Sequence, residues 1–134
     1  MAKRLPAHYF NAWFHADLRG RKLPLRFAVV TAYNPMGKKT PPAENRRRDA
    51  ALRRRLKARG ISCFRVTGGN RDGSHREPGW GLVVDSPKAA RTLAALFRQN
   101  AYYWVSSRRI FLGSAAGGPL KRAGSWNARQ ADWR

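Results

Sequence analysis

The chain has 134 residues and carries 28 Lys and Arg against seven Asp and Glu, a formal net charge of +21 at pH 7. This length fits one domain, and the longest apolar runs are too short to cross a bilayer. An excess of one sign of charge repels itself in a compact protein. The composition therefore disfavours an ordinary globular domain of near-zero net charge and favours a polyanionic partner such as nucleic acid.

Three further features bound the class of protein. Arginine outnumbers lysine, which a coding preference explains, but such a preference does not account for the scarcity of acids. The lone cysteine, Cys63, excludes an internal disulfide and stands in an apolar run where it packs as a core residue. No apolar stretch follows Lys3 and Arg4, so no signal peptide is expected. We expect a cytoplasmic protein.

The first elements are predicted from periodicity and turn signals. The aromatic segment 9–18 reads as a strand, although a short helix fits nearly as well. Residues 25–32 are apolar and β-branched, which is typical of a central strand, and the Asn34-Pro35 turn follows it. A helix is expected over 42–59, with Thr40 as its N-cap and Gly60 as its end.

The second half of the chain repeats this strand-turn-helix order. The Ser86-Pro87 pair is a helix start signal, and the apolar positions after it share one helical face. The expected elements are a strand at 61–67, a polar stretch at 68–78, a strand at 80–84, a helix from 87 to about 99, and a hairpin of 101–105 with 109–112.

The order β-β-α-β-β-α-β-β predicts an α+β fold, a mostly antiparallel sheet with two helices on one face. The other face is then solvated or a binding surface. Residues 1–114 are expected to form this single domain. Residues 115–134 are a basic Gly/Ala/Arg tail without periodicity, which we expect to be mobile.

Two motifs carry a family resemblance. The run 27–35, Phe-Ala-Val-Val-Thr-Ala-Tyr-Asn-Pro, contains Asn34 and Pro35, and the run 68–80 contains Gly68, Gly69 and the Asp-Gly-x-x-x-Glu-Pro loop that ends at Pro78. Together they resemble the bacterial family named domain of unknown function 3293, over about residues 25–114. The resemblance implies no activity, substrate or catalytic residue. The first helix is more basic than the resemblance implies.

Most of the basic residues fall in the predicted first helix, in turns and in the tail. Like charges three and four residues apart destabilise an isolated helix, and a phosphate backbone along one side would relieve that repulsion by neutralising them. A solvated helix face is the alternative. The predicted nucleic-acid-binding residues are Arg46, Arg47, Arg53, Arg54, Arg55, Lys38, Lys39, Arg108, Arg109, Lys121 and Arg122.

The polar loop holds an acid, a histidine and a second acid. His75 is a candidate general base with Asp72 or Glu77 as its orienting group. One histidine and two carboxylates make a weak metal set, so no metal and no cofactor is expected. Turn chemistry is the alternative, because Asp72-Gly73 is a tight-turn pair and Glu77-Pro78 fixes entry to the next strand.

Three functions remain open from the sequence. The first is a small basic protein that binds RNA, DNA or a ribonucleoprotein through phosphate contacts. The second is an enzyme acting on a nucleotide or other phosphorylated substrate at the Asp72–Glu77 loop. The third is an interaction module for an acidic protein. Tyr102 and Trp104 on one strand face would stack on bases if exposed, whereas core packing is the alternative reading of both.

Overall fold

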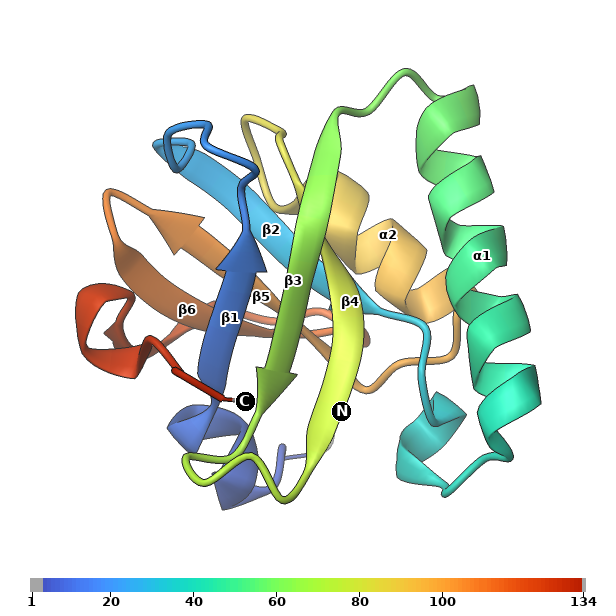
Figure 1. Cartoon of the computed structure of the whole chain (residues 1–134). Helices are drawn as coiled ribbons and strands as arrows, with labels where there is room; N and C mark the ends of the chain where they lie inside the picture. Colours follow the sequence, from blue (N-terminus) through green and yellow to red (C-terminus); the bar gives the residue numbers. More distant parts are fainter. Residues whose placement is uncertain (1–3, 134) are drawn as a thin grey trace.

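The computed structural model describes residues 4–133 and contains, within them, a seven-stranded curled sheet and two α-helices (Figure 1). The strands are β1 (Trp13–Asp17), β2 (Arg26–Thr31), β3 (Cys63–Gly69), β4 (Arg76–Leu82), β5 (Ala101–Ser106), β6 (Arg109–Ser114) and β7 (Lys121–Ser125). The helices are α1 (Pro42–Ala58) and α2 (Lys88–Leu96), with short 3-10 helices η1 (Ala7–Asn11), η2 (Pro35–Gly37) and η3 (Asn127–Arg129).

The sheet runs in the order β1-β3-β4-β2-β5-β6-β7, and all neighbouring strands are antiparallel. Its two edges meet through the end of the chain, because Phe14 forms a bridge with Gln130 and accepts a 2.8 Å hydrogen bond from the Ala131 amide. The inner face of the curl therefore encloses a core instead of facing solvent. This core includes Phe14, Phe27, Val29, Phe64, Val66, Val105, Ile110, Leu112 and Trp126.

The two helices cover the outer face of the sheet, as the sequence predicts, and the α+β fold class is confirmed. Alternation along the strands sends one set of side chains inward and the other toward the helices. The outer core combines Leu52 and Leu56 of α1, Ala90, Leu93 and Ala94 of α2, and Ala28, Val30, Leu82, Tyr102 and Trp104 of the sheet. The inner face of the sheet is the side that the sequence left open, and it is buried core.

Helix α1 is fixed to the sheet by a charged contact as well as by its leucines. Arg65 of β3 donates to both carboxylate oxygens of Asp49, each at 2.9 Å. The same guanidinium lies 3.8 Å from the centre of the Trp80 ring. A two-pronged Arg–carboxylate pair fixes orientation as well as distance, so α1 is held in one rotation about its axis.

The C-terminal segment differs from the predicted mobile tail. Residues 121–125 form β7 on the edge of β6, and Trp126 is 3% exposed and stacks on Phe14 at 5.4 Å between ring centres. Arg129 donates to the carbonyls of Phe10 and Ala12. Composition misled the prediction, because the glycines and alanines of this segment lie in a turn and an edge strand while its tryptophan reaches the core.

Smaller differences concern element boundaries. Segment 9–18 contains both of its predicted alternatives, η1 and then β1. Helix α1 ends before Gly60, which adopts φ +68° as a helix-ending glycine does. Thr40 is not the N-cap, because Pro41 holds that position and the Thr40 hydroxyl donates to the Lys38 carbonyl at 3.0 Å. None of the helices within residues 4–133 is long and apolar enough to cross a membrane.

Candidate functional site

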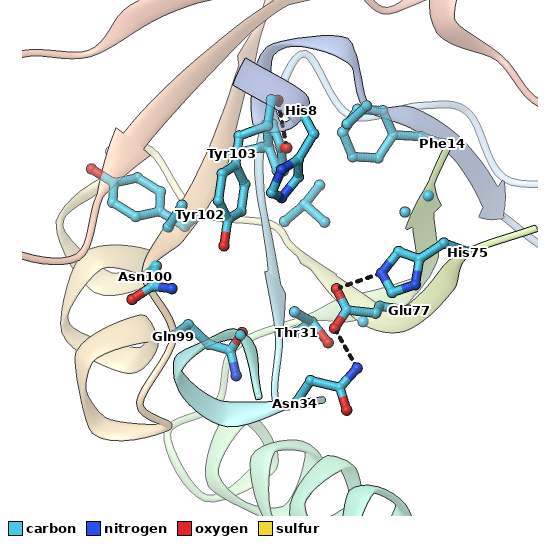
Figure 2. A pocket seen from close by; sticks show the side chains of 18 of the residues that line it. His8, Phe14, Thr31, Asn34, His75, Glu77, Gln99, Asn100, Tyr102 and Tyr103 are labelled. Carbon is cyan, nitrogen blue, oxygen red and sulfur yellow. Dashed lines mark hydrogen bonds and ion pairs between the residues drawn. The ribbon is translucent and has the colours of Figure 1, made fainter. Parts of the chain in front are cut away.

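A pocket of about 750 Å³ opens at one end of the inner face of the sheet, next to η1 (Figure 2). Phe14, Val29 and Val66 give it an apolar floor, and Tyr103 forms part of a wall. Small-molecule pockets in proteins span roughly 300–1,000 Å³, so this pocket is large enough for a ligand of nucleoside size. Among the described residues, no Lys or Arg lines it.

Glu77 is the acid that lines this pocket, and two neighbours hold it in place. Its Oε1 accepts a 2.9 Å hydrogen bond from the Asn34 side-chain amide, and its Oε2 lies 3.8 Å from Nε2 of His75. The Glu77 side chain is 28% exposed, whereas that of His75 is 65% exposed. Figure 2 shows the three side chains in a row along one side of the pocket.

Strand pairing explains why Asn34 reaches Glu77. Strands β2 and β4 are antiparallel neighbours, so the end of β2 lies beside the start of β4. The Thr31 hydroxyl ties these ends together by donating to the Pro78 carbonyl at 2.8 Å and accepting from the Tyr33 amide at 3.1 Å. The two family motifs, 27–35 and 68–80, therefore meet at the pocket.

Asn34 is itself fixed by Asn45, the buried polar residue of the described chain, which is 5% exposed. Asn45 Oδ1 accepts from the Asn34 amide at 2.8 Å, and Asn45 Nδ2 donates to Asn34 Oδ1 at 3.0 Å. Asn34 adopts the left-handed conformation, with φ 50° and ψ 62°, which asparagine tolerates better than most residues. The chain Asn45–Asn34–Glu77 fixes a carboxylate before any ligand arrives.

Tyr103 contributes a hydroxyl group to the wall of the pocket. Burial raises its pKa above the ordinary tyrosine value, Tyr9 and Glu77 raise it further, and Arg129 acts in the opposite direction. The hydroxyl therefore stays neutral, and it donates to the Tyr9 carbonyl at 2.7 Å. Its role is to hold η1 against the sheet, not to act as a base.

The predicted loop triad is only partly assembled. His75 and Glu77 lie together at the pocket, but Asp72 is fully exposed at the tip of the β3–β4 hairpin. The Ser74 backbone amide and hydroxyl lower the pKa of Asp72, and that amide lies 2.9 Å from its Oδ1. This is the geometry of a turn-stabilising aspartate. Within residues 4–133, no cluster of three or more His, Cys, Asp and Glu could hold a metal ion.

The glycines of the second motif lie in strands instead of a long loop. Gly68 and Gly69 end β3, and a side chain on Gly69 would collide with the His75 carbonyl. A Cβ on Gly79 would come within 2.7 Å of the Val30 carbonyl. Strand β4 begins at Arg76, before the predicted start at Trp80, because these glycines let the backbones pair closely.

The predicted nucleic-acid-binding residues fall into two groups on different elements. One group is on α1 and just before it, and the other is on the β5–β6 turn and β7. All of these side chains are exposed: Arg46, Arg47, Arg53, Arg54, Arg55, Lys38 and Lys39 in the first group, and Arg108, Arg109, Lys121 and Arg122 in the second.

Helical geometry sorts the first group further. At 3.6 residues per turn, Arg46, Arg47, Arg54 and Lys57 fall on the side of α1 away from its buried leucines. Arg53 lies on the flank of the helix, where its guanidinium is 5.6 Å from the centre of the Trp80 ring. We call the four residues Arg46, Arg47, Arg54 and Lys57 the outer stripe. It extends about 16 Å along the helix at 1.5 Å per residue.

Sequence reasoning missed several residues of the pocket. Asn45 stands among arginines in a helix, where it reads as a surface residue. The signal that was present is its low helix propensity in the first turn, where an asparagine side chain usually bonds a neighbouring backbone group. Gln99 and Asn100 lie between α2 and β5, Tyr103 lies within β5, and nothing in their spacing joins them to Glu77.

The sequence model of the family described as "Protein of unknown function (DUF3293)" matches residues 30–102. This span covers the end of β2, both helices, the turn that carries Asn34 and the strand that carries Glu77. No curated protein and no solved structure matches the chain.

Proposed function

The chain belongs to the DUF3293 family, whose description assigns no activity, and we propose that it binds nucleic acid, RNA or a ribonucleoprotein foremost, through the outer stripe of α1. The observation that carries this proposal is an exposed helix side with four cations and no acid among them. Contacts would be to phosphates and would not read the base sequence.

The acids near the stripe do not neutralise it. Asp49 is bound on both oxygens by Arg65 of β3, so its carboxylate is turned toward the sheet. Glu44 lies in the first turn of α1, where a negative charge favours the helix dipole. The four cations of the stripe are therefore left to each other and to solvent ions, and phosphates that replace those ions would release them and gain entropy.

The anchoring of α1 supports the same reading. Because Arg65 and the buried leucines hold the helix in one rotation, the stripe is presented outward without reorganisation. Lys38 and Lys39 lie just before the helix and extend the positive surface beyond its N-terminus. We place this binding in the cytoplasm, since the chain carries a single cysteine and so has no internal disulfide.

The test compares two triple variants with the same change in charge. Arg46, Arg47 and Arg54 are changed together to Glu on the stripe, and Arg109, Lys121 and Arg122 are changed together to Glu as the control. Fluorescence anisotropy with a labelled oligouridine should show a much larger loss for the stripe variant, with unchanged thermal melts. An equal loss in both variants would mean that net charge, and not α1, determines binding.

One observation favours a second candidate, an enzyme acting on a nucleotide or other phosphorylated substrate. The pocket contains an oriented carboxylate beside a histidine, the arrangement that general acid–base catalysis uses. The lining lacks the Lys or Arg that would bind a phosphoryl group directly, so we rank it second.

A further inference from the structure

The pocket differs chemically from the rest of this basic protein. It has one acid, Glu77, and no Lys or Arg among its described lining residues, although the chain carries 28 of them. The nearest basic group in that lining is the His75 imidazole, with Nε2 3.8 Å from Oε2 of Glu77, and without Lys or Arg beside it the carboxylate disfavours anionic ligands such as phosphates and carboxylates. The lining therefore selects a neutral or positively charged group that brings hydrogen-bond donors to Glu77.

The carboxylate is prepared to accept such donors. Asn34 takes one lone pair of Oε1, and each carboxylate oxygen has two. Both oxygens can therefore each accept one further hydrogen bond, as a pair of parallel N–H donors would supply. Because Asn45 fixes Asn34, the plane of the carboxylate is set in advance, and little rotamer entropy is lost on binding.

The other walls suit a flat ring with an acceptor of its own. Tyr9 and Tyr103, which are both partly exposed, give the pocket aromatic surface. Asn100 also lines it, and its side-chain amide makes no hydrogen bond with another described residue. A planar ring could therefore contact apolar surface while its oxygen accepts from Asn100.

Cations lie just outside the pocket. Gly37, Asn70 and Gln99 line it, and each is next in sequence to an exposed basic residue. These three rim residues are Lys38, Arg71 and Arg98. Among its described lining residues the pocket holds one carboxylate and no Lys or Arg, while basic residues adjoin its lining, which matches a nucleotide whose base enters while its phosphate stays outside.

We propose that the pocket binds a guanine base, with Glu77 accepting from N1–H and from the 2-amino group. Guanine presents two adjacent donors on one edge, which match the two oxygens of a carboxylate. Adenine and cytosine place an unprotonated ring nitrogen beside their amino group, and uracil places a carbonyl on each side of its N–H. Each of these edges would set a lone pair against Glu77.

The guanine comes from a free nucleotide or from a strand held on α1. Recognition of the base does not depend on the proposed function, whereas extrusion of the base from a bound strand rests on it. The experiment therefore has one arm without nucleic acid and one arm with it.

The first arm measures binding of guanosine, inosine and adenosine by calorimetry. Guanosine should bind, inosine should bind more weakly because it lacks the 2-amino group, and adenosine should bind at least about tenfold more weakly than guanosine. Glu77→Gln should weaken guanosine about ten- to a hundredfold, and the matched exposed change Asp85→Asn should leave it unchanged. Asn100→Ala removes no bond of the fold and should also weaken guanosine.

Equal binding of guanosine and adenosine, or guanosine binding that survives Glu77→Gln in a protein that melts normally, would overturn the proposal. The second arm compares oligouridine with the same strand carrying one guanosine. A preference for the guanosine strand that Glu77→Gln removes indicates an extruded base. Guanosine binding without that preference supports the pocket with a free nucleotide. Oligouridine binding that ignores the stripe variant overturns the proposed function and leaves the pocket intact.

Discussion

The outer stripe of α1 and the pocket differ in charge, burial and rigidity. The stripe is a set of exposed arginines and one lysine whose side chains extend into solvent. The pocket has a single carboxylate, held by a chain of amide hydrogen bonds and surrounded by strands. A surface of the first kind attracts any polyanion, whereas a site of the second kind selects by hydrogen-bond pattern.

The contrast shows that composition describes only one of these regions. Net charge is dominated by residues that face solvent, and it predicts a salt-dependent surface. Net charge gives no information about a cavity whose described lining contains no Lys or Arg. The predictions below separate the two regions by properties that one has and the other lacks, in order of decreasing effect.

Salt should separate the two regions most strongly. With about six phosphate contacts, RNA affinity should fall on the order of a thousandfold between about 50 and 200 mM salt. Guanosine is uncharged, so its affinity for the pocket should stay nearly constant over the same range. Titrations at four salt concentrations check both, and a salt slope for guanosine as steep as that for RNA would remove the distinction.

Closure of the sheet, on which the pocket depends and the stripe does not, should require Trp126. Trp126→Ala should cost about 3–5 kcal/mol of stability, because it empties a core site against Phe14 and Phe27. The control Trp133→Ala should cost much less, since that ring is only partly buried. Denaturant unfolding gives both values. Equal costs would restore the expectation of a mobile tail.

Asn45 should matter for the pocket and not for the stripe. Asn45→Ala leaves the Asn34 amide without its buried partner and should cost about 1–3 kcal/mol. Guanosine affinity should fall because Asn34 no longer orients Glu77, while RNA affinity stays the same. The exposed control Asn127→Ala should change neither. Calorimetry with each variant measures the affinities, and a fall in RNA affinity alone would contradict this division.

The smallest effect concerns Asp72, which belongs to neither region. Its folded-state pKa is lowered from 3.8 by Ser74, so the ionised form stabilises the fold. That contribution is present at pH values above 3.8 and is lost as the pH falls through the lower, folded-state value. Asp72→Asn should melt slightly lower than wild type at neutral pH and equally at strongly acid pH. A difference that persists in acid would assign Asp72 another role.

Much of the fold follows from local signals in the chain. The β-branched run of β2, the apolar stripe of α2 and the glycine after α1 each specify an element without tertiary context, and the alternation of Tyr102, Tyr103 and Trp104 gives their faces correctly. All three aromatics pack in the two cores, so none of them offers the exposed stacking surface that was considered. The prediction of a mobile tail was wrong because Trp126 and Ala131 close the sheet through contacts with Phe14, which is far away in the sequence.

The pocket was less predictable for the same reason. The nearness of Asn34 to Glu77 could be expected, because both residues lie at strand ends. Asn45 and Asn100 reach the site only through the packing of α1 and the connection after α2, which no spacing along the chain encodes. The inner face became a core because β1 meets the end of the chain, and that contact spans nearly the whole sequence.

The central claim is that α1 binds nucleic acid while the pocket binds a base. The most direct measurement is an NMR titration of the labelled protein with oligouridine and, separately, with guanosine. Oligouridine should shift backbone amides along 42–58 and leave Val29, Thr31 and Val66 unmoved, and guanosine should give the reverse pattern. Oligouridine shifts that gather on β6 and β7, or one common set of shifts for both ligands, would contradict the account.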